Sequence, residues 1–390
     1  MIYFSPMEAS DFGPEITGRL VPLPDGPADA RVAFVPNPLP PDWTWPERLW
    51  PLLLEARTAL ASLSGMGKHL KSAEILLRPL QLREAQLSSQ LEGTITDPHQ
   101  QVLFYAEPSY PTSENDPKNA FREIFNYTEA LRLRLDRERE WPLSLALIRE
   151  LHKILMDGVR GSDQSPGQFR KIQNQIQRPA RFVPPPPLYL DETLGDLETF
   201  LRNTDLTTYD PLVRAFLAHY QFEAIHPFRD GNGRVGRLLL ALCISEWCDL
   251  SNQWLYMSAY FEQHKTRYMD LLLAVSTHGA WEPWIEFCLR GVISQSKDTE
   301  KRADNLLGLH REFQERLKDG SVRLAALIDK LFEYPVVTVT WVQNHFSVTH
   351  PTARADLRRL ESMGIVRPLA APRLTYYCDR ILNITYEGVR

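Results

Sequence analysis

The twelve residues 226–237, which read HPFRDGNGRVGR, decide the fold of this chain because of what lies on either side of them. In the preceding segment, DPLVRAFLAHYQFEAI, apolar residues recur at helical spacing, at Leu212, Phe216 and Tyr220. The following segment, LLLALCISEW, is apolar and free of helix breakers. We therefore predict a tight loop between two largely buried helices, the second beginning near Gly231 or Asn232.

The loop itself has the composition of an anion site. Gly231, Asn232 and Gly233 tolerate the dihedral angles of a tight loop and let backbone N–H groups approach a ligand closely. These N–H groups lie at a helix start, where unpaired donors and the helix dipole favour negative charge. Arg234 and Arg237 are three residues apart and so share one face of the helix. Two guanidinium groups beside such a cradle predict a site for more than one phosphate.

Two further residues of the motif suggest chemistry. Asp230 precedes the cradle and offers a hard oxygen ligand where Mg²⁺ could bridge phosphates. His226 is the only group of the motif able to act as a base near neutral pH. Taken singly, a Gly-Asn-Gly turn, a histidine beside an aromatic ring and an arginine at a helix start are more often structural. Their combination at fixed spacing favours transfer of a nucleotidyl or phosphoryl group.

Composition sets broad limits on the rest of the protein. With 390 residues, 43% of them hydrophobic and 24% charged, the chain is long enough for two or three ordinary globular domains. A net charge of −5 argues against a general polyanion binder but allows a local basic patch. No signal-peptide pattern or membrane-length apolar run is apparent, so we expect a cytoplasmic protein without a membrane partner. The cysteines lack metal spacing and favour buried free thiols over disulfides; they are Cys243, Cys248, Cys288 and Cys378.

Most of the remaining chain has helical periodicity, so the predicted fold class is mainly α. Residues 1–45 are rich in proline and predict an extended arm over the surface. Residues 167–187, GQFRKIQNQIQRPARFVPPPP, alternate polar and apolar side chains and end in four prolines. They predict a small β-hairpin flap followed by polyproline II, although a plain surface loop fits equally well.

The last seventy residues change character. Two short helical segments precede a longer one, which begins at Thr349 and ends at Gly364, and IVRPLAAPRLTYYCDRILNIT then predicts strand, turn, strand. This order is typical of a winged helix-turn-helix. Nine Lys and Arg against six Asp and Glu suit weak nucleic-acid binding without requiring it. The predicted division is an N-terminal arm and helical region over 1–115, a catalytic core over 116–300, a linker helix over 301–320 and the winged helix over 321–390.

The motif at 226–237 resembles the signature HxFx(D/E)GNGRxxR of Fic-domain proteins, whose members typically transfer AMP from ATP to protein hydroxyl groups. The resemblance implies a Fic-type helical bundle in which His226 deprotonates the target hydroxyl and Asp230 binds Mg²⁺. Arg234 would hold the β-phosphate of ATP and Arg237 the γ-phosphate. The ATP-binding positions that the resemblance implies are Gly231, Asn232, Gly233, Arg234, Val235, Gly236 and Arg237.

A second match lies upstream, in SSQLEG at residues 88–93. It fits the inhibitory pattern (S/T)xxxE(G/N) of the same family, with Ser88, Glu92 and Gly93 at the fixed positions. By itself this pattern is common at helix ends with a glycine cap. Together with the signature it resembles the subclass whose inhibitory helix is N-terminal. The Glu92 carboxylate beside Arg237 would then occupy the γ-phosphate position and turn the α-phosphate away from in-line attack.

Two other segments resemble parts of the family. The flap at 167–187 resembles the element that binds a target peptide by strand addition, which leaves the target protein open. The segment SAYFEQHKTRYMDLLLAV resembles the one that covers adenine and ribose, so Gln263 or Tyr268 could contact the base, with packing an equal alternative. A homodimer is compatible with such an enzyme, and nothing in the sequence fixes its interface.

The leading hypothesis is therefore an autoinhibited protein adenylyltransferase that uses ATP and Mg²⁺ to modify a Ser, Thr or Tyr hydroxyl of a target protein or of itself. One alternative is the reverse reaction, in which Glu92 aligns a water molecule to remove AMP from a modified protein. Another is a DNA-binding regulator with a nucleotide-sensing core. In that case the predicted recognition helix would contact DNA through Arg354, Arg358 and Arg359.

Overall fold

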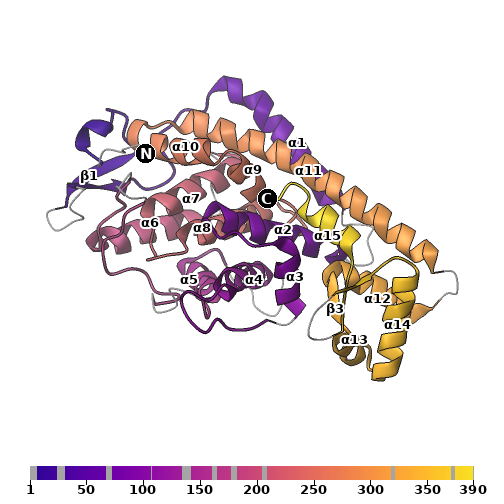
Figure 1. Ribbon diagram of the computed structural model, residues 1–390. Helices are drawn as coiled ribbons and strands as arrows, with labels where there is room; N and C mark the ends of the chain where they lie inside the picture. Colours follow the sequence, from indigo (N-terminus) through magenta and orange to yellow (C-terminus); the bar gives the residue numbers. More distant parts are fainter. Residues whose placement is uncertain are drawn as a thin grey trace.

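The protein is described from a computed structural model (Figure 1). The residues it describes are 7–23, 31–66, 73–106, 108–133, 142–159, 165–176, 182–203, 209–317, 321–369 and 374–389. Helices dominate these ranges, as the sequence predicts. Within them, none of the helices combines the length and the hydrophobicity needed to cross a bilayer.

The N-terminal half contains eight α-helices, a pair of strands and three 3-10 turns among the described residues. The strands are β1 (Gly18–Pro22) and β2 (Val32–Pro36), and the turns are η1 (Ala9–Asp11), η2 (Glu47–Leu49) and η3 (Pro187–Tyr189). The helices are α1 (Trp50–Met66), α2 (Glu74–Leu91), α3 (Pro98–Ala106), α4 (Lys118–Arg132), α5 (Leu145–Leu155), α6 (Leu190–Arg202), α7 (Pro211–Ile225) and α8 (Asn232–Trp247).

The C-terminal half continues with α9 (Ser258–Gln263), α10 (Lys265–His278), α11 (Trp281–Arg316), α12 (Val322–Glu333), β3 (Val336–Thr338), α13 (Val339–Phe346), α14 (His350–Ser362), β4 (Arg367–Leu369), β5 (Thr375–Tyr377) and α15 (Asp379–Tyr386). Helix α11 is continuous across residues 300 and 301, between which the sequence analysis divides the core from a linker helix.

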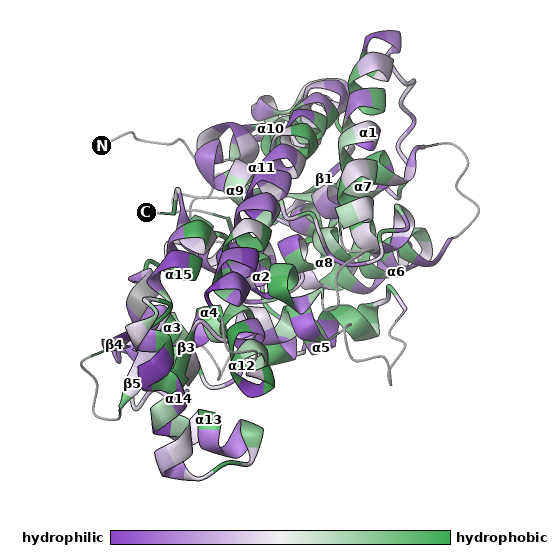
Figure 2. Ribbon diagram, turned by 90° about the vertical axis from the view of Figure 1, so that its right-hand side faces the viewer, coloured by the Kyte–Doolittle hydropathy of each residue, from purple (hydrophilic) through white to green (hydrophobic). Residues whose placement is uncertain are grey.

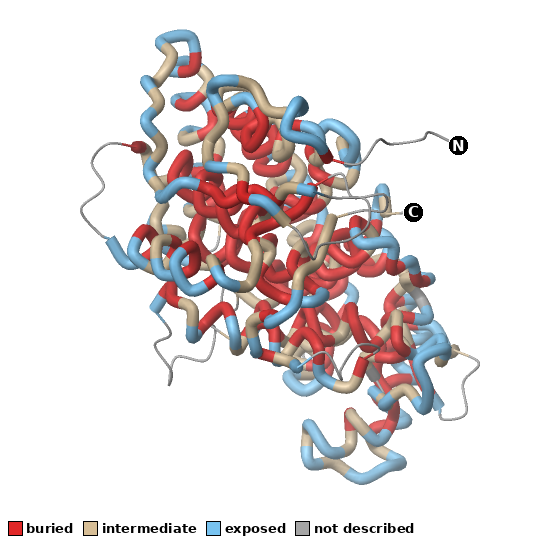
Figure 3. Tube along the Cα trace, turned by 90° about the vertical axis from the view of Figure 1, so that its left-hand side faces the viewer, coloured by how far each residue is buried: buried red, intermediate tan, exposed pale blue. Residues whose placement is uncertain are grey.

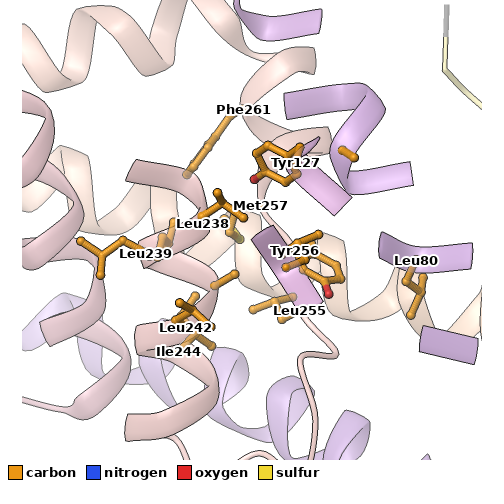
Figure 4. Close-up of a cluster of buried hydrophobic side chains, with 14 of the residues drawn as sticks. Leu80, Tyr127, Leu238, Leu239, Leu242, Ile244, Leu255, Tyr256, Met257 and Phe261 are labelled. Atoms are coloured by element: carbon orange, nitrogen blue, oxygen red, sulfur yellow. The ribbon is translucent and has the colours of Figure 1, made fainter. Parts of the chain in front are cut away.

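Helices α7 and α8 pack closely on each other, and α7 also contacts α6, α10, α11 and β2. Figure 3 shows that buried chain is concentrated in the interior of the molecule. Nearly every residue of α7 is buried, because other helices cover it on several sides. The apolar end of α8 packs onto the segment before α9, and Figure 4 shows Leu238 and Leu242 near Leu255 and Met257. This packing fixes the loop between α7 and α8 from both ends.

The N-terminal arm differs from the prediction of an extended surface segment. Its strands β1 and β2 pair in antiparallel register, with Leu20 opposite Phe34. Phe34 is fully buried, and its N–H donates to the Val183 carbonyl oxygen at 2.9 Å. The prolines that flank these strands obscured a short β-hairpin that covers part of the core.

The segment at 167–187 contains one antiparallel bridge, between Ile176 and Phe182. Residues 177–181 lie outside the described residues, so the predicted hairpin is seen only at its base. The prolines at 184–186 follow outside regular secondary structure, and Pro187 begins η3.

The described residues of the C-terminal unit, 321–369 and 374–389, have the element order helix, strand, helix, helix, strand, strand, helix, with sheet order β3-β5-β4. Its identity as a winged helix stays a prediction. One element was predicted wrongly, because residues 379–386 form helix α15 rather than a strand. The side chains of Ile381, Leu382 and Thr385 share one helical face, which is buried against α2 and α11. Figure 2 shows α13 and α14 at one end of the molecule, below α12.

Candidate active site

The loop between α7 and α8 is held by its own side chains. His226 ends α7 in the left-handed conformation (φ 50°, ψ 59°), and Gly231 (φ 76°) immediately precedes α8, so the predicted helix start is confirmed. The Asn232 side chain donates to the Phe228 carbonyl oxygen and accepts from the Phe228 N–H, both at 2.8 Å. Phe228 is fully buried and stacks on His152 with ring centroids 3.8 Å apart. Asn232 therefore fixes the shape of the loop from inside.

The surroundings of His226 fix its tautomer and its charge. Its Nδ1 lies 3.3 Å from the carbonyl oxygen of Glu223, which can only accept, so Nδ1 carries the hydrogen and Nε2 keeps its lone pair. The Arg170 side chain donates to the His226 carbonyl oxygen at 2.9 Å and secures the backbone. Burial, followed by the positive charge of Arg170, lowers the pKa of His226 to about 4. The imidazole is therefore uncharged at neutral pH.

Two glycines at the start of α8 lie against carboxylate side chains, which would have to move to admit a larger residue. A Cβ atom on Gly233 would lie 2.2 Å from the Glu92 carboxylate, and one on Gly236 would lie 2.2 Å from the Glu223 carboxylate. Val235 is fully buried. Arg234, Val235 and Gly236, which the sequence places among the ATP-binding positions, are absent from the cavity lining, and their part in ATP binding stays a prediction.

Arg237 brings together the signature and the upstream inhibitory pattern. Its side chain is 3% exposed, and its guanidinium group lies 2.7 Å from the Glu92 carboxylate. It also donates to the Ser88 hydroxyl at 2.8 Å and to the Ser88 carbonyl oxygen at 2.9 Å. Gly93 follows Glu92 in the left-handed region (φ 89°), where glycine is favoured. Ser88 and Glu92 of the pattern thus contact the last arginine of the signature, and Gly93 follows them at the end of the helix.

Electrostatics keep this pair ionised. Partial removal from water acts to raise the pKa of Glu92, but the charge of Arg237 and its hydrogen bond outweigh this, so the pKa lies below its ordinary value. Burial acts to lower the pKa of Arg237, and the nearby Glu92 carboxylate reverses the effect and raises it. The ion pair is therefore maintained throughout the neutral range.

Arg234 and Asp230 occupy different environments. Arg234 is buried and pairs with the buried Glu123 carboxylate at 3.2 Å, while Thr94 donates to the same carboxylate at 2.7 Å. The Asp230 side chain is 59% exposed and accepts the Gly231 N–H at 2.6 Å. Among the described residues there is no group of three side chains able to hold a metal ion by themselves. A single exposed carboxylate nevertheless fits Mg²⁺, which is commonly bound by one or two carboxylates together with substrate phosphates.

A cavity of about 510 Å³ opens beside these residues. This volume is within the range of small-molecule sites. The lining residues are Leu91, Glu92, Gly93, Gln175, Ile176, Phe182, Tyr220, Glu223, Ala224, His226, Arg229, Asp230, Gly231, Asn232, Gly233, Arg237, Lys265, Tyr268, Met269, Leu272, Leu273 and Ser276. The ends of the segment 167–187 at Ile176 and Phe182, the loop between α7 and α8, and one face of α10 therefore line one cavity.

The two residues predicted to contact the base are placed differently. Tyr268 lines the cavity, although its hydroxyl already donates to His219 Nε2 at 2.9 Å. Gln263 is exposed and is absent from the lining. Two residues that line the cavity, Glu223 and Lys265, were not predicted from the sequence. An acidic residue within the apolar α7 was a visible signal for Glu223, whereas nothing distinguished Lys265 from other surface lysines.

Comparison with known proteins gives two family matches. Residues 142–244 match the Fic/DOC family, and residues 50–136 match the Fic/DOC family N-terminal region. A protein adenylyltransferase, fic-1, of Caenorhabditis elegans is 37% identical over 100 residues, which is 26% of this chain and 19% of that protein. A probable protein adenylyltransferase of Aquifex aeolicus is 36% identical over 108 residues, or 28% of this chain and 32% of that protein. The chain thus spans about a fifth to a third of these relatives.

Solved structures agree with the fold. A Fic family protein from Desulfovibrio desulfuricans G20 has a TM-score of 0.56 at 21% identity and covers 87% of this chain and 98% of its own. Fic-1 from C. elegans has a TM-score of 0.51 at 20% identity and covers 66% of this chain and 74% of its own. At these identities the likeness concerns the fold alone.

Proposed function

The chain belongs to the Fic/DOC family, and from this premise we propose that it transfers AMP from ATP to a hydroxyl group of a protein. The observation that carries the proposal is a neutral His226 in the same cavity as the buried Arg237. The names of the similar proteins of C. elegans and A. aeolicus support the same chemistry. A cavity of this size accommodates a nucleotide.

The proposed reaction uses the residues of the loop directly. Nε2 of His226 accepts the proton of a target Ser, Thr or Tyr hydroxyl, and the hydroxyl oxygen attacks the α-phosphorus of ATP. The bond between the α-phosphorus and the bridging oxygen breaks, and pyrophosphate leaves. The N–H groups at the start of α8 stabilise the charge that develops on the phosphate oxygens. Arg237 holds the terminal phosphate.

Asp230 would contribute its carboxylate to Mg²⁺ bound with ATP, and the ion would neutralise charge on the phosphates. Arg234, unlike Asp230, would have to rearrange before it could bind a phosphate. To hold a phosphate it would have to share its guanidinium group with Glu123. The target segment would dock at the base of the flap, where Ile176 and Phe182 line the cavity, and Ile172 on the same segment is an exposed apolar side chain.

We infer that the enzyme is autoinhibited by Glu92. The carboxylate occupies Arg237, so a γ-phosphate would have to displace it. The lowered pKa of Glu92 keeps the competing charge in place at neutral pH. ATP that binds without this contact would lack the alignment required for in-line attack.

Autolabelling tests the reaction. The Glu92→Gly protein is incubated with Mg²⁺ and ATP labelled at the α-phosphate, with γ-labelled ATP in parallel and Glu92→Gly/His226→Ala as the control. Covalent α-label that the control lacks is the expected result. Label from γ-labelled ATP alone would mean phosphoryl transfer instead.

Removal of AMP from a modified protein is a second candidate, because the Glu92 carboxylate lines the same cavity as His226 and could align a water molecule. AMP transfer and AMP removal should respond in opposite ways to Glu92→Gly. This change should raise AMP transfer and abolish AMP removal. Incubation of an AMP-labelled substrate with each protein separates the two activities.

DNA binding is a third candidate, favoured by helix α14. Its inner face is apolar and buried, at Ala353, Leu357 and Leu360, whereas Arg354 and Arg358 are exposed on the outer face. A basic exposed helix at one end of the molecule fits a DNA groove. Salt-dependent binding to duplex DNA that weakens in Arg358→Ala would support this role, and no binding at low salt would remove it.

A further inference from the structure

Each of the last four carbonyl groups of helix α2, which lie just before Glu92, accepts a hydrogen bond from outside the helix or from the turn that follows it. A helix leaves its last four carbonyl groups without intrahelical partners. Here the carbonyl groups of Ser89 and Gln90 accept N–H groups of the following turn. The remaining two accept from cationic side chains, Ser88 from Arg237 and Leu91 from Lys265. Cations are favoured at this end of the helix dipole.

Of these two cations, only Arg237 belongs to the signature. Lys265 is the first residue of α10 and lies outside both sequence motifs. Its ammonium group donates to the Leu91 carbonyl oxygen, one residue before Glu92. It therefore restrains the backbone from which the inhibitory carboxylate extends.

Three hydrogen bonds join α2 to the segment 258–265, and the bond from Lys265 to Leu91 is the last of them. Ser258 donates to the buried Glu84 carboxylate at 2.5 Å, and Gln90 donates to Glu262 at 2.8 Å. The partners in segment 258–265 are four and three residues apart, whereas those on α2 are Glu84 and, six and seven residues later, Gln90 and Leu91. The contacts therefore follow one line along the interface of α2 with α9 toward the carboxyl end of α2. The line ends beside Glu92.

The same segment continues into the wall of the cavity. Lys265 itself lines the cavity, and Tyr268, Met269 and Leu272 line it further along α10. The contact between Lys265 and Leu91 thus joins the helix that carries Glu92 to the helix that a bound nucleotide would touch.

We propose that Lys265 is a positioning residue for the inhibitory carboxylate, and that its bond to the Leu91 carbonyl group holds Glu92 against Arg237. This inference rests on the proposed autoinhibition and adds the contact that sets its strength. Release of Lys265 frees the end of α2 and raises the fraction of molecules in which Arg237 is available to ATP.

The test measures incorporation of α-labelled ATP by Lys265→Met, with Lys265→Arg as the conservative variant. Both are made with Glu92 intact and in the Glu92→Gly background, and the KM for ATP and the Tm are determined for each protein. Lys297→Met is the matched control, because Lys297 is an exposed lysine of α11 whose partner is Glu55 and which is absent from the cavity lining.

With Glu92 intact, Lys265→Met should raise the rate about three- to tenfold, the net effect of one ordinary hydrogen bond, because the Lys265 side chain is exposed and water weakens its contact. In the Glu92→Gly background this gain should be absent, since the carboxylate that Lys265 is proposed to position is no longer there. Lys265→Arg should stay near wild type, because it can still donate to Leu91. The Lys297→Met control should match wild type.

Other outcomes overturn the inference in distinguishable ways. If Glu92→Gly itself brings no gain, the proposed autoinhibition fails. A gain in Glu92→Gly without one in Lys265→Met overturns only the role of Lys265. An equal gain in both backgrounds shows an effect independent of Glu92. A lower rate with a higher KM in both backgrounds assigns Lys265 to ATP binding instead.

Discussion

Replacing Glu92 by glycine should activate the enzyme, and the structure allows the size of the gain to be worked out. The Glu92 carboxylate lies 2.7 Å from the Arg237 guanidinium group. At an effective dielectric constant of about 20, two unit charges at this distance attract by about 6 kcal/mol. That figure is an upper limit, because the Glu92 side chain is 41% exposed and water screens it.

A better measure is the net contribution of one hydrogen bond between charged groups, about 1.5–3 kcal/mol. If this free energy keeps Arg237 from ATP, its loss raises the competent fraction about tenfold to 150-fold. Glycine is tolerated at residue 92, where the backbone has ordinary dihedral angles (φ −86°, ψ 1°). Glu92→Gln, which keeps the shape and loses the charge, should give a smaller gain.

The assay is the initial rate of α-label incorporation at saturating ATP, with the Tm of each protein as a check on folding. A Glu92→Gly protein that folds like wild type but labels no faster would refute the reasoning. So would equal gains in Glu92→Gly and in the Glu92→Gly/Arg237→Ala double variant, because the predicted gain passes through Arg237.

Three further predictions concern other parts of the site. In the Glu92→Gly background, kcat should stay level from pH 8 to 6 and fall only below about pH 5, because burial lowers the pKa of His226 to about 4; a decline centred near pH 6.5 would contradict this. Burial raises the pKa of Glu84 to about 7, so ionisation of Glu84 destabilises the fold as pH rises from about 5 to 8; Glu84→Gln should therefore raise the Tm at pH 8 more than at pH 5.5. Asn232→Ala removes both bonds to Phe228 and should cost about 2 kcal/mol in urea unfolding, whereas an unchanged midpoint would show that the loop is held elsewhere.

The central hairpin of helices could be predicted from sequence because its signals are local. Apolar spacing marks α7 and α8, and the glycines mark the loop between them. The meeting of Glu92 with Arg237 came instead from two patterns that a known family combines. Neither residue type nor spacing alone joins positions 145 residues apart.

The contacts missed from sequence are those between distant elements. Glu123 pairs with Arg234 from 111 residues away, and no local pattern announces it. Lys265 contacts α2 only because α9 packs along that helix. At the C-terminus, the β-branched and aromatic residues near Tyr377 favoured strands, but burial of one face against α2 and α11 made residues 379–386 helical.

The most direct test of the central claim compares the affinities of ATP and ADP by calorimetry. If Glu92 occupies the γ-phosphate position on Arg237, the wild-type protein should bind the two nucleotides about equally. The Glu92→Gly protein should bind ATP about tenfold more tightly than ADP, as expected for one regained contact between charged groups. Arg237→Ala in the same background should remove this preference. A wild-type protein that already prefers ATP as strongly as Glu92→Gly would contradict the account, because Arg237 would then be free to bind the γ-phosphate with Glu92 in place.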